Sequence, residues 1–274
     1  MKSFRHRLTL SLSGVVLLMA ACTGATEAGG TDGPVGASPS RNVSASGAAV
    51  SGDVAVFAAA SLTESFTQIG EDFQTANPGA RVTFNFGASS ALAQQITSGA
   101  PADVFAAASP ATMKTVLDAG GAKGEPVVFV RNRLQIAVPD GNPGQVTTLT
   151  DFADADKTIA LCAEQVPCGA AAHKAFAAAG ITPAPDTLEQ DVKFTVTKVS
   201  LGEVDAALVY RTDVLAAGDK VEGIDFPEAE GAINDYPIAT LAAAPNAAAA
   251  QAFVDYVLSP DGQRVLEAAG FERP

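Results

Sequence analysis

Short apolar runs alternate with helix-like patterns along most of the chain. An apolar run at 54–57 is typical of a buried strand, and Leu62, Phe66, Ile69 and Phe73 then recur on one helix face. The same pattern predicts further strands at 82–86, 104–105, 127–130, 134–138, 158–162 and 206–210, and helices around Leu92 and Ile96, around Met113, Val116 and Leu117, and over 169–179, 192–201, 247–258 and 262–269. This alternation predicts parallel βαβ units and an α/β fold.

Residues 1–21 have the pattern of an export signal rather than of a folded segment. Basic residues precede an apolar stretch at 8–20, which is too short to span a bilayer as a helix. Small residues directly before Cys22 resemble the lipobox of bacterial lipoproteins, in which the signal is cleaved before the cysteine and the cysteine is acylated. The alternative is a plain secretory signal with an incidental Cys22.

Residues 22–52 are predicted to form a lipidated cysteine and a flexible tether. The stretch 23–52 is made of Gly, Ala, Ser, Thr and Pro with almost no large apolar side chain, so it cannot bury enough surface to fold. The alternative is an ordered N-terminal arm. About 220 residues then remain, enough for one large domain or two small lobes.

The net charge of the exported chain limits the kinds of partner that it can bind. Removal of the three basic residues of the signal from 17 leaves 14, against 30 acidic residues, so the net charge is −16. Nucleic acid is excluded as a partner, because phosphate binding needs clustered Lys and Arg. An acidic protein of this kind can hold an anion only in a neutral pocket that is lined by local dipoles.

Cys162 and Cys168 are the two cysteines beyond Cys22. In an exported chain a disulfide between them is expected, and closure of the seven-residue loop would stabilise the fold by about 2–2.5 kcal/mol. The alternative is half of a metal site, but His6 lies in the signal and His173 is the other histidine of the chain.

Two turns place a serine where a strand ends and a helix begins. Ser61 follows the strand at 54–57, and Ser89 follows the strand at 82–86, each among small residues. Free backbone N–H groups and the positive end of the helix dipole can hold an anion at such a turn without any cation. The two turns therefore favour an oxyanion receptor over an enzyme.

Five segments together resemble the ModA family, the molybdate-binding proteins that supply ABC importers. The segments are FAAASLT at 57–63, FGASSALA at 86–93, GAPADVF at 99–105, VPCG at 166–169 and GEVDAALVY at 202–210. The resemblance extends over about residues 53–274. It implies an exported, monomeric solute-binding protein that binds molybdate and also tungstate, without a cofactor, and that delivers the anion to an importer permease. The lipid on Cys22 would hold it on the outer face of the membrane.

The resemblance also implies a two-lobed type II periplasmic-binding-protein fold. Its ligand lies between two α/β lobes that are joined by two crossover strands. We expect the crossings near residues 131–133 and 235–238. Lobe one would then comprise 53–131 and 237–274, and lobe two would comprise 132–236.

The family's ligand shell maps onto Ser61, Ser89, Cys168, Val192 and Tyr210. By resemblance, the two serines donate through hydroxyl and backbone N–H, Cys168 and Val192 donate through backbone N–H, and Tyr210 donates through its hydroxyl. Many members have alanine at the position of Cys168, which leaves the backbone donor unchanged. A disulfide to Cys162 would stiffen this binding loop.

The residues themselves agree with this assignment. Ser61, Ser89, Cys168 and Asp191 each precede a predicted helix, so four helix N-termini could meet at one anion. None of the five shell residues carries a formal charge. A pocket made only of donors favours fully deprotonated molybdate, tungstate or sulfate over hydrogen phosphate.

Simpler structural roles are open for the same residues. Ser61 with Glu64 matches a capping box, Ser89 would also serve as an ordinary N-cap, and Tyr210 would also serve as core. Lys193 and His173 are expected to be exposed to solvent.

Three other functions compete with molybdate binding. A secreted hydrolase would need a base beside its nucleophile, and only His173 remains after signal removal. The chain shows neither a G-x-S-x-G elbow nor a phosphate-binding G-x-x-x-x-G-K-[ST] loop. The same fold binding sulfate, phosphate or a chelated metal is the second alternative, and a passive surface adhesin is the third.

Overall fold

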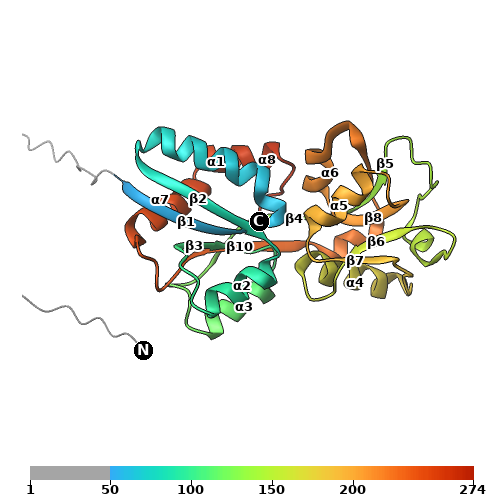
Figure 1. Cartoon of the computed structure of the whole chain (residues 1–274), viewed down its shortest axis with the longest axis horizontal. Coiled ribbons are helices and arrows are strands. Elements are labelled where there is room, and N and C mark those ends of the chain that lie inside the picture. The colour runs from blue at the N-terminus through green and yellow to red at the C-terminus, as the bar shows by residue number, and fades with distance from the viewer. Residues whose placement is uncertain (1–49) are drawn as a thin grey trace, which may run out of the picture. The chain divides into compact units, whose positions relative to one another are not determined.

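Two five-stranded sheets organise residues 50–274, the part of the chain that the computed structural model describes (Figure 1). The predicted signal, the lipidation site at Cys22 and most of the predicted tether lie outside the described residues. The first strand begins at Ser51, three residues earlier than the sequence pattern indicates.

Sheet one has the strand order β2-β1-β3-β10-β4. β1 is parallel to β2 and β3, whereas β10 is antiparallel to β3 and β4. The strands are β1 (Ser51–Ala59), β2 (Gly79–Gly87), β3 (Val104–Ala106), β4 (Val127–Asn132) and β10 (Asn234–Thr240).

Sheet two has the strand order β7-β6-β8-β5-β9. β6 is parallel to β7 and β8, whereas β5 is antiparallel to β8 and β9. The strands are β5 (Leu134–Pro139), β6 (Ile159–Cys162), β7 (Thr187–Glu189), β8 (Ala206–Tyr210) and β9 (Val221–Ile224). The predicted parallel units are present in both sheets, whereas β5 and β10 enter their sheets from the other sheet and run against their neighbours.

Helices follow most of the strands, as the periodicity predicts. Leu62, Phe66, Ile69 and Phe73 are all buried on one helix face, and Gly180 ends another helix with a φ of 68°. The helices are α1 (Thr63–Ala76), α2 (Ser89–Thr97), α3 (Pro110–Asp118), α4 (Pro167–Ala179), α5 (Val192–Ser200), α6 (Arg211–Ala217), α7 (Ala247–Leu258) and α8 (Pro260–Ala268), with 3₁₀ turns η1 (Ala60–Leu62), η2 (Leu149–Ala153), η3 (Gly218–Lys220) and η4 (Pro227–Ala232).

Each sheet is covered on both faces, and each has its own core. On sheet one, α1, α7 and α8 pack on one face, where Phe66 meets Phe129 and Phe253 at ring-centroid distances of 5.8 and 6.1 Å. α2 and α3 pack on the opposite face around Phe105 and Met113. A separate core surrounds sheet two. The structure is therefore a two-lobed α/β fold, as expected.

The chain passes between the sheets at β4 and β10. Only Arg133 separates β4 from β5, and Asn132 pairs with Asn234 across the two strands. β10 pairs within sheet one from Asn234 onward. The residue limits of the two lobes given above stay a prediction.

Candidate functional site

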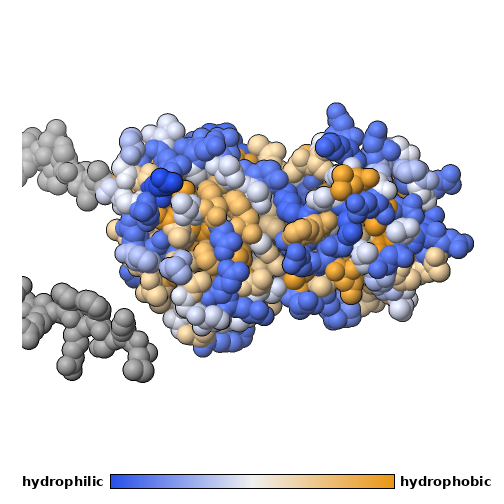
Figure 2. All heavy atoms as spheres, viewed as in Figure 1, coloured by the Kyte–Doolittle hydropathy of each residue, from blue (hydrophilic) through white to orange (hydrophobic). Residues whose placement is uncertain are grey.

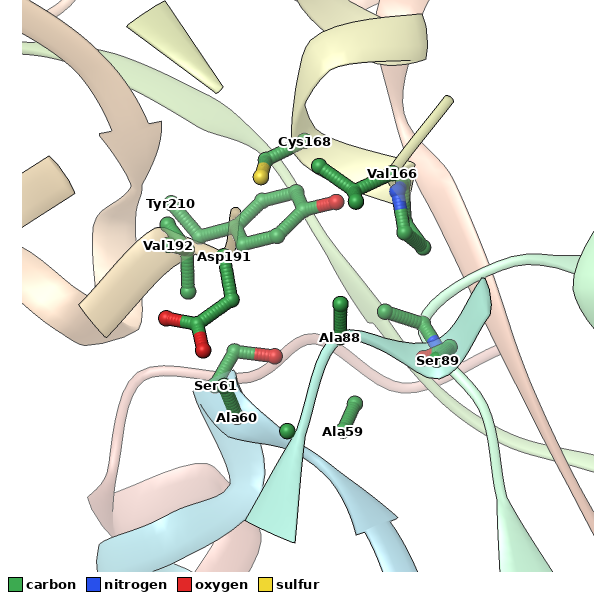
Figure 3. Close-up of a pocket in the computed structure, with 13 residues that line it drawn as sticks. Ala59, Ala60, Ser61, Ala88, Ser89, Val166, Cys168, Asp191, Val192 and Tyr210 are labelled. Atoms are coloured by element: carbon green, nitrogen blue, oxygen red, sulfur yellow. The ribbon is translucent and has the colours of Figure 1, made fainter. Parts of the chain in front are cut away.

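A small cavity lies where the ends of both sheets meet. Its volume is about 20 Å³. Figure 3 shows Ser61 and Ser89 on one side of it and Cys168, Val192 and Tyr210 on the other. The structure thus brings together all five residues that the sequence singles out. The remaining lining residues are Ala59, Ala60, Gly87, Ala88, Ala108, Val166, Pro167 and Asp191.

Three helical segments begin at this cavity without a side-chain cap. Ala59, Ala88 and Val166 precede η1, α2 and α4, and none of the three can cap a helix with its side chain. The first N–H groups of these segments have no intrahelical acceptor, so they are available to a ligand. The positive ends of the helix dipoles coincide there.

Helices that begin elsewhere in residues 50–274 differ. Ser109 caps α3, Asn246 caps α7 and Ser259 caps α8, in each case by accepting a backbone N–H with a side-chain oxygen. The turns η3 and η4 also begin without a side-chain cap, so what distinguishes the cavity is that several uncapped starts meet at it.

The start of α5 is capped selectively. Oδ1 of Asp191 accepts the N–H of Lys193 at 2.9 Å and the N–H of Phe194 at 3.1 Å. The N–H of Val192 is left for the cavity. Asp191 also lines the cavity, although the sequence did not indicate this. Its carboxylate is hydrogen-bonded to the first turn of its own helix, α5.

The loop before α4 is held by close packing and by a disulfide. Cys162 and Cys168 form a disulfide with a Cα–Cα distance of 5.8 Å, as predicted. With both sulfur atoms bonded to each other, they form no half-site for a metal. A Cβ on Gly169 would lie 2.0 Å from the backbone oxygen of Ala163, so only glycine fits there. Pro167 has no N–H, and the first donors of α4 are therefore those of Cys168 and Gly169.

Ser89 is buried, and its hydroxyl has a fixed partner. Its Oγ accepts the backbone N–H of Ala108 at 2.9 Å. Ser89 is the first residue of α2 and Ala88 is its N-cap, so the alternative of Ser89 as a simple N-cap is wrong. The hydroxyl keeps its own proton for another acceptor.

Ser61 lies within η1 and forms no capping box. Its Oγ is 2.8 Å from the hydroxyl of Tyr236, while Glu64 bonds Lys193 instead of the N-cap backbone. The capping-box alternative is therefore wrong, because both side chains have partners from distant parts of the chain.

Tyr210 is both buried in the core and part of the cavity wall. Its hydroxyl accepts Nδ2 of Asn234 at 2.7 Å. Burial raises the pKa of the Tyr210 phenol well above its usual value, and the nearby Tyr236 hydroxyl raises it further. The phenol therefore keeps its proton at neutral pH and can donate it.

Lys193 does not line the cavity, as expected, but its side chain is only 25% exposed. Its Nζ lies 2.8 Å from Glu64 on α1 and 3.1 Å from Asp213 on α6. Asp213 is fully buried, and burial raises its pKa to about 6, although Lys193 beside it lowers the pKa. His173 lies exposed on α4, as predicted.

The residues that hydrogen-bond the hydroxyls of Ser61 and Tyr210, directly or through one another, were not predicted from the sequence. Asn132, Asn234 and Tyr236 belong to no motif, and they reach the site only because β4 and β10 pair. The one available signal was their position near the expected crossings.

Residues 50–274 lack two features that would suggest other functions. No helix there is long and apolar enough to cross a membrane. Nor do His, Cys, Asp and Glu side chains gather there in a group of three or more that could hold a metal ion.

Comparison with known proteins gives consistent matches. Residues 54–272 match the family described as bacterial extracellular solute-binding protein. The Molybdate-binding protein ModA of Mycobacterium tuberculosis is 42% identical over 221 residues, which cover 81% of this chain and 85% of that protein. The Escherichia coli protein of the same name is 30% identical over 249 residues, which cover 86% and 95%.

A solved structure has a similar fold. The periplasmic molybdate-binding protein of Azotobacter vinelandii superposes with a TM-score of 0.71 at 21% identity. The match covers 81% of this chain and 99% of that chain. At this identity the likeness supports the two-lobed fold alone.

Proposed function

Because the chain belongs to the family of bacterial extracellular solute-binding proteins, we propose that it captures molybdate, and also tungstate, between its two lobes and delivers the anion to an ABC importer. The relatives at 42% and 30% identity are both named for molybdate binding. The proposal assigns the anion to the cavity lined by Ser61, Ser89, Cys168, Val192 and Tyr210.

The observation that supports this proposal best is the set of uncapped helix starts around one cavity. η1, α2 and α4 begin there without side-chain caps, and α5 leaves one N–H uncapped. Backbone N–H groups at helix N-termini bind anions without any cationic side chain. Such a site fits a strongly acidic protein, because no lysine or arginine lines the cavity.

The size of the cavity favours a small ion. Pockets for drug-sized molecules usually have volumes of about 300–1,000 Å³, and this one has about 20 Å³. Hydroxyls of Ser61, Ser89 and Tyr210 lie on opposite sides of it, so one compact anion can contact groups from both lobes. Contacts of this kind would hold the lobes together around the ligand.

Sulfate is the main competitor, since it has the same charge and shape. Its shorter bonds would leave some donors unpaired in a shell built for a larger anion. Each unpaired buried donor costs roughly 1–3 kcal/mol, so two of them would weaken sulfate at least about thirtyfold. The same shell has no size criterion that separates molybdate from tungstate.

The N-terminal pattern extends the proposal to location. We propose that the protein is exported as a monomer and anchored through lipid on Cys22, with residues up to about 52 as the tether. The permease of the importer would then meet the ligand-bound domain at the membrane surface.

Titration calorimetry on the unlipidated domain tests the proposal. Molybdate and tungstate should each bind with a stoichiometry of one, and sulfate and phosphate should bind at least about thirtyfold more weakly. Equal affinity for sulfate and molybdate would contradict the proposed ligand, and absence of binding by every oxyanion would contradict the site.

A further inference from the structure

Two asparagines face each other where the chain crosses between the sheets. Asn132 ends β4, Asn234 begins β10, and the two residues pair in register. Both side chains are buried, with exposed fractions of 1% and 5%. Each side-chain amide stands directly behind a hydroxyl that belongs to the cavity or supports it.

The amide of Asn234 donates to Tyr210. Its Nδ2 lies 2.7 Å from the Tyr210 hydroxyl and 3.5 Å from the carbonyl oxygen of Pro167. The carbonyl can only accept, so the amide nitrogen rather than the amide oxygen faces both groups. A phenol that accepts from Asn234 keeps its own proton for the cavity.

The amide of Asn132 acts on Ser61 through Tyr236. Oδ1 of Asn132 accepts the N–H of Arg133 at 3.1 Å, which turns Nδ2 toward Thr212 at 2.9 Å and the Tyr236 hydroxyl at 3.5 Å. The Tyr236 hydroxyl and Oγ of Ser61 are 2.8 Å apart, and either of them can donate. A Tyr236 hydroxyl that accepts from Asn132 is free to donate its proton to Ser61. With Tyr236 as the donor, Ser61 keeps its own proton to donate.

Ser89 has the same arrangement with a backbone group in place of an amide. The N–H of Ala108 donates to its Oγ at 2.9 Å. Each of the three cavity hydroxyls therefore has a group behind it that can donate, and with that group as the donor each can present a proton in front. The shared arrangement on three different elements is the observation on which the inference rests.

We propose that Asn132 and Asn234 are positioning residues that fix the hydroxyl protons of Ser61 and Tyr210 toward the cavity, so that the site selects oxyanions that carry no proton. This inference rests on the proposed function. A fully deprotonated tetrahedral anion offers only acceptors, whereas hydrogen phosphate also brings a donor, which then has no acceptor to meet. Residues of β4 and β10, the strands at which the chain passes between the sheets, thus determine which anions are bound, although neither asparagine lines the cavity.

The substitution Asn234→Asp tests this polarity at constant side-chain size. It replaces Nδ2 with an oxygen that accepts, so Tyr210 would donate to residue 234 and turn its lone pairs toward the anion. The added charge repels molybdate and hydrogen phosphate alike, so the readout is the ratio of the two dissociation constants at pH 7.5. We expect the preference for molybdate over phosphate to fall at least about tenfold.

A matched control makes the same chemical change away from the cavity. Asn246 caps α7 and donates Nδ2 to backbone oxygens of Ser51 and Asp53. Asn246→Asp should lower the unfolding free energy and leave the molybdate-to-phosphate preference within about threefold of wild type. A structural effect alone would therefore not reproduce the expected result.

The outcomes separate the two claims. A preference that stays within about threefold of wild type in Asn234→Asp, or phosphate that stays unbound up to about 10 mM, overturns the positioning role while wild-type molybdate binding stands. Wild-type protein that binds no molybdate refutes the proposed function instead. If Asn234→Asp does not fold, Asn132→Asp makes the same change behind Ser61 and is judged by the same ratio.

Discussion

Removal of the Ser89 hydroxyl should affect both binding and folding. Ser89 is buried at the start of α2, and its Oγ accepts the N–H of Ala108 at 2.9 Å. Ser89→Ala takes away a donor to the anion and also the acceptor of Ala108. The backbone N–H of Ser89 itself is retained. From the sequence alone we would expect a loss of affinity with little change in stability, and the bond to Ala108 changes that expectation.

The two losses have separate magnitudes. A hydrogen bond to a charged group contributes about 1.5–3 kcal/mol, so molybdate should bind roughly 10- to 150-fold more weakly. Ala108 is also buried, and its unpaired N–H should lower the unfolding free energy of the empty protein by about 1–3 kcal/mol. For a domain of this size, each kcal/mol lowers the melting temperature by about 2–4 °C.

Calorimetry with molybdate and denaturant unfolding of the empty domain measure the two effects separately. Ser109→Ala is the matched control, because Ser109 caps α3 outside the cavity. It should destabilise the fold by about 1 kcal/mol and leave affinity unchanged. If Ser89→Ala weakens folding as expected but binds molybdate as tightly as wild type, then Ser89 is a structural residue and the site is assigned wrongly.

Three further changes probe the surroundings of the site. The double substitution Cys162→Ser with Cys168→Ala removes the disulfide, so the unfolding free energy should fall by about 2 kcal/mol. Molybdate should bind more weakly by about tenfold or less, because the loop is then not ordered before binding. Unaltered affinity in calorimetry would refute pre-ordering of the loop by the disulfide. Asp213→Asn should unfold in denaturant with the same free energy as wild type near pH 4. The raised pKa of Asp213 means that the buried carboxyl loses its proton at a cost, so wild type should become less stable than the variant by on the order of 2–3 kcal/mol as the pH rises through about 6. A stability difference that is independent of pH would contradict this. Glu64→Gln breaks a partly exposed ion pair with Lys193, so calorimetry should show that molybdate binds at most about fivefold more weakly. The difference from wild type should be smaller in about 1 M salt, and a loss of affinity that salt does not reduce would refute an electrostatic contribution of this pair.

The sequence predicts well what depends on neighbouring residues. The turns at Ser61 and Ser89 are visible because small residues separate an apolar run from a helical repeat. β7 is missed because Thr187–Glu189 is short and partly exposed, and β10 is hard to recognise because it contains Pro237. α6 is missed because it follows Tyr210 without any turn residue.

Contacts between distant segments were beyond the sequence pattern. Lys193 looks like an exposed helix residue until α1 and α6 bring Glu64 and Asp213 to it. The partners of the hydroxyls, Asn132 and Asn234, likewise depend on the pairing of β4 with β10. The resemblance to a family located the shell of the site, and the structure adds the groups behind it.

A crystal structure of the domain with molybdate, recorded at the molybdenum absorption edge, would show where the anion binds. We expect one anomalous peak in the cavity (Figure 3), with the oxygen atoms of the anion within about 2.7–3.2 Å of the hydroxyls of Ser61, Ser89 and Tyr210 and of the N–H groups of Cys168 and Val192. Molybdenum should be absent from the exposed surface, where polar and apolar side chains are mixed (Figure 2), and from the groove beside α4. A peak outside this cavity, or an anion in it that contacts neither serine, would refute the proposed molybdate site.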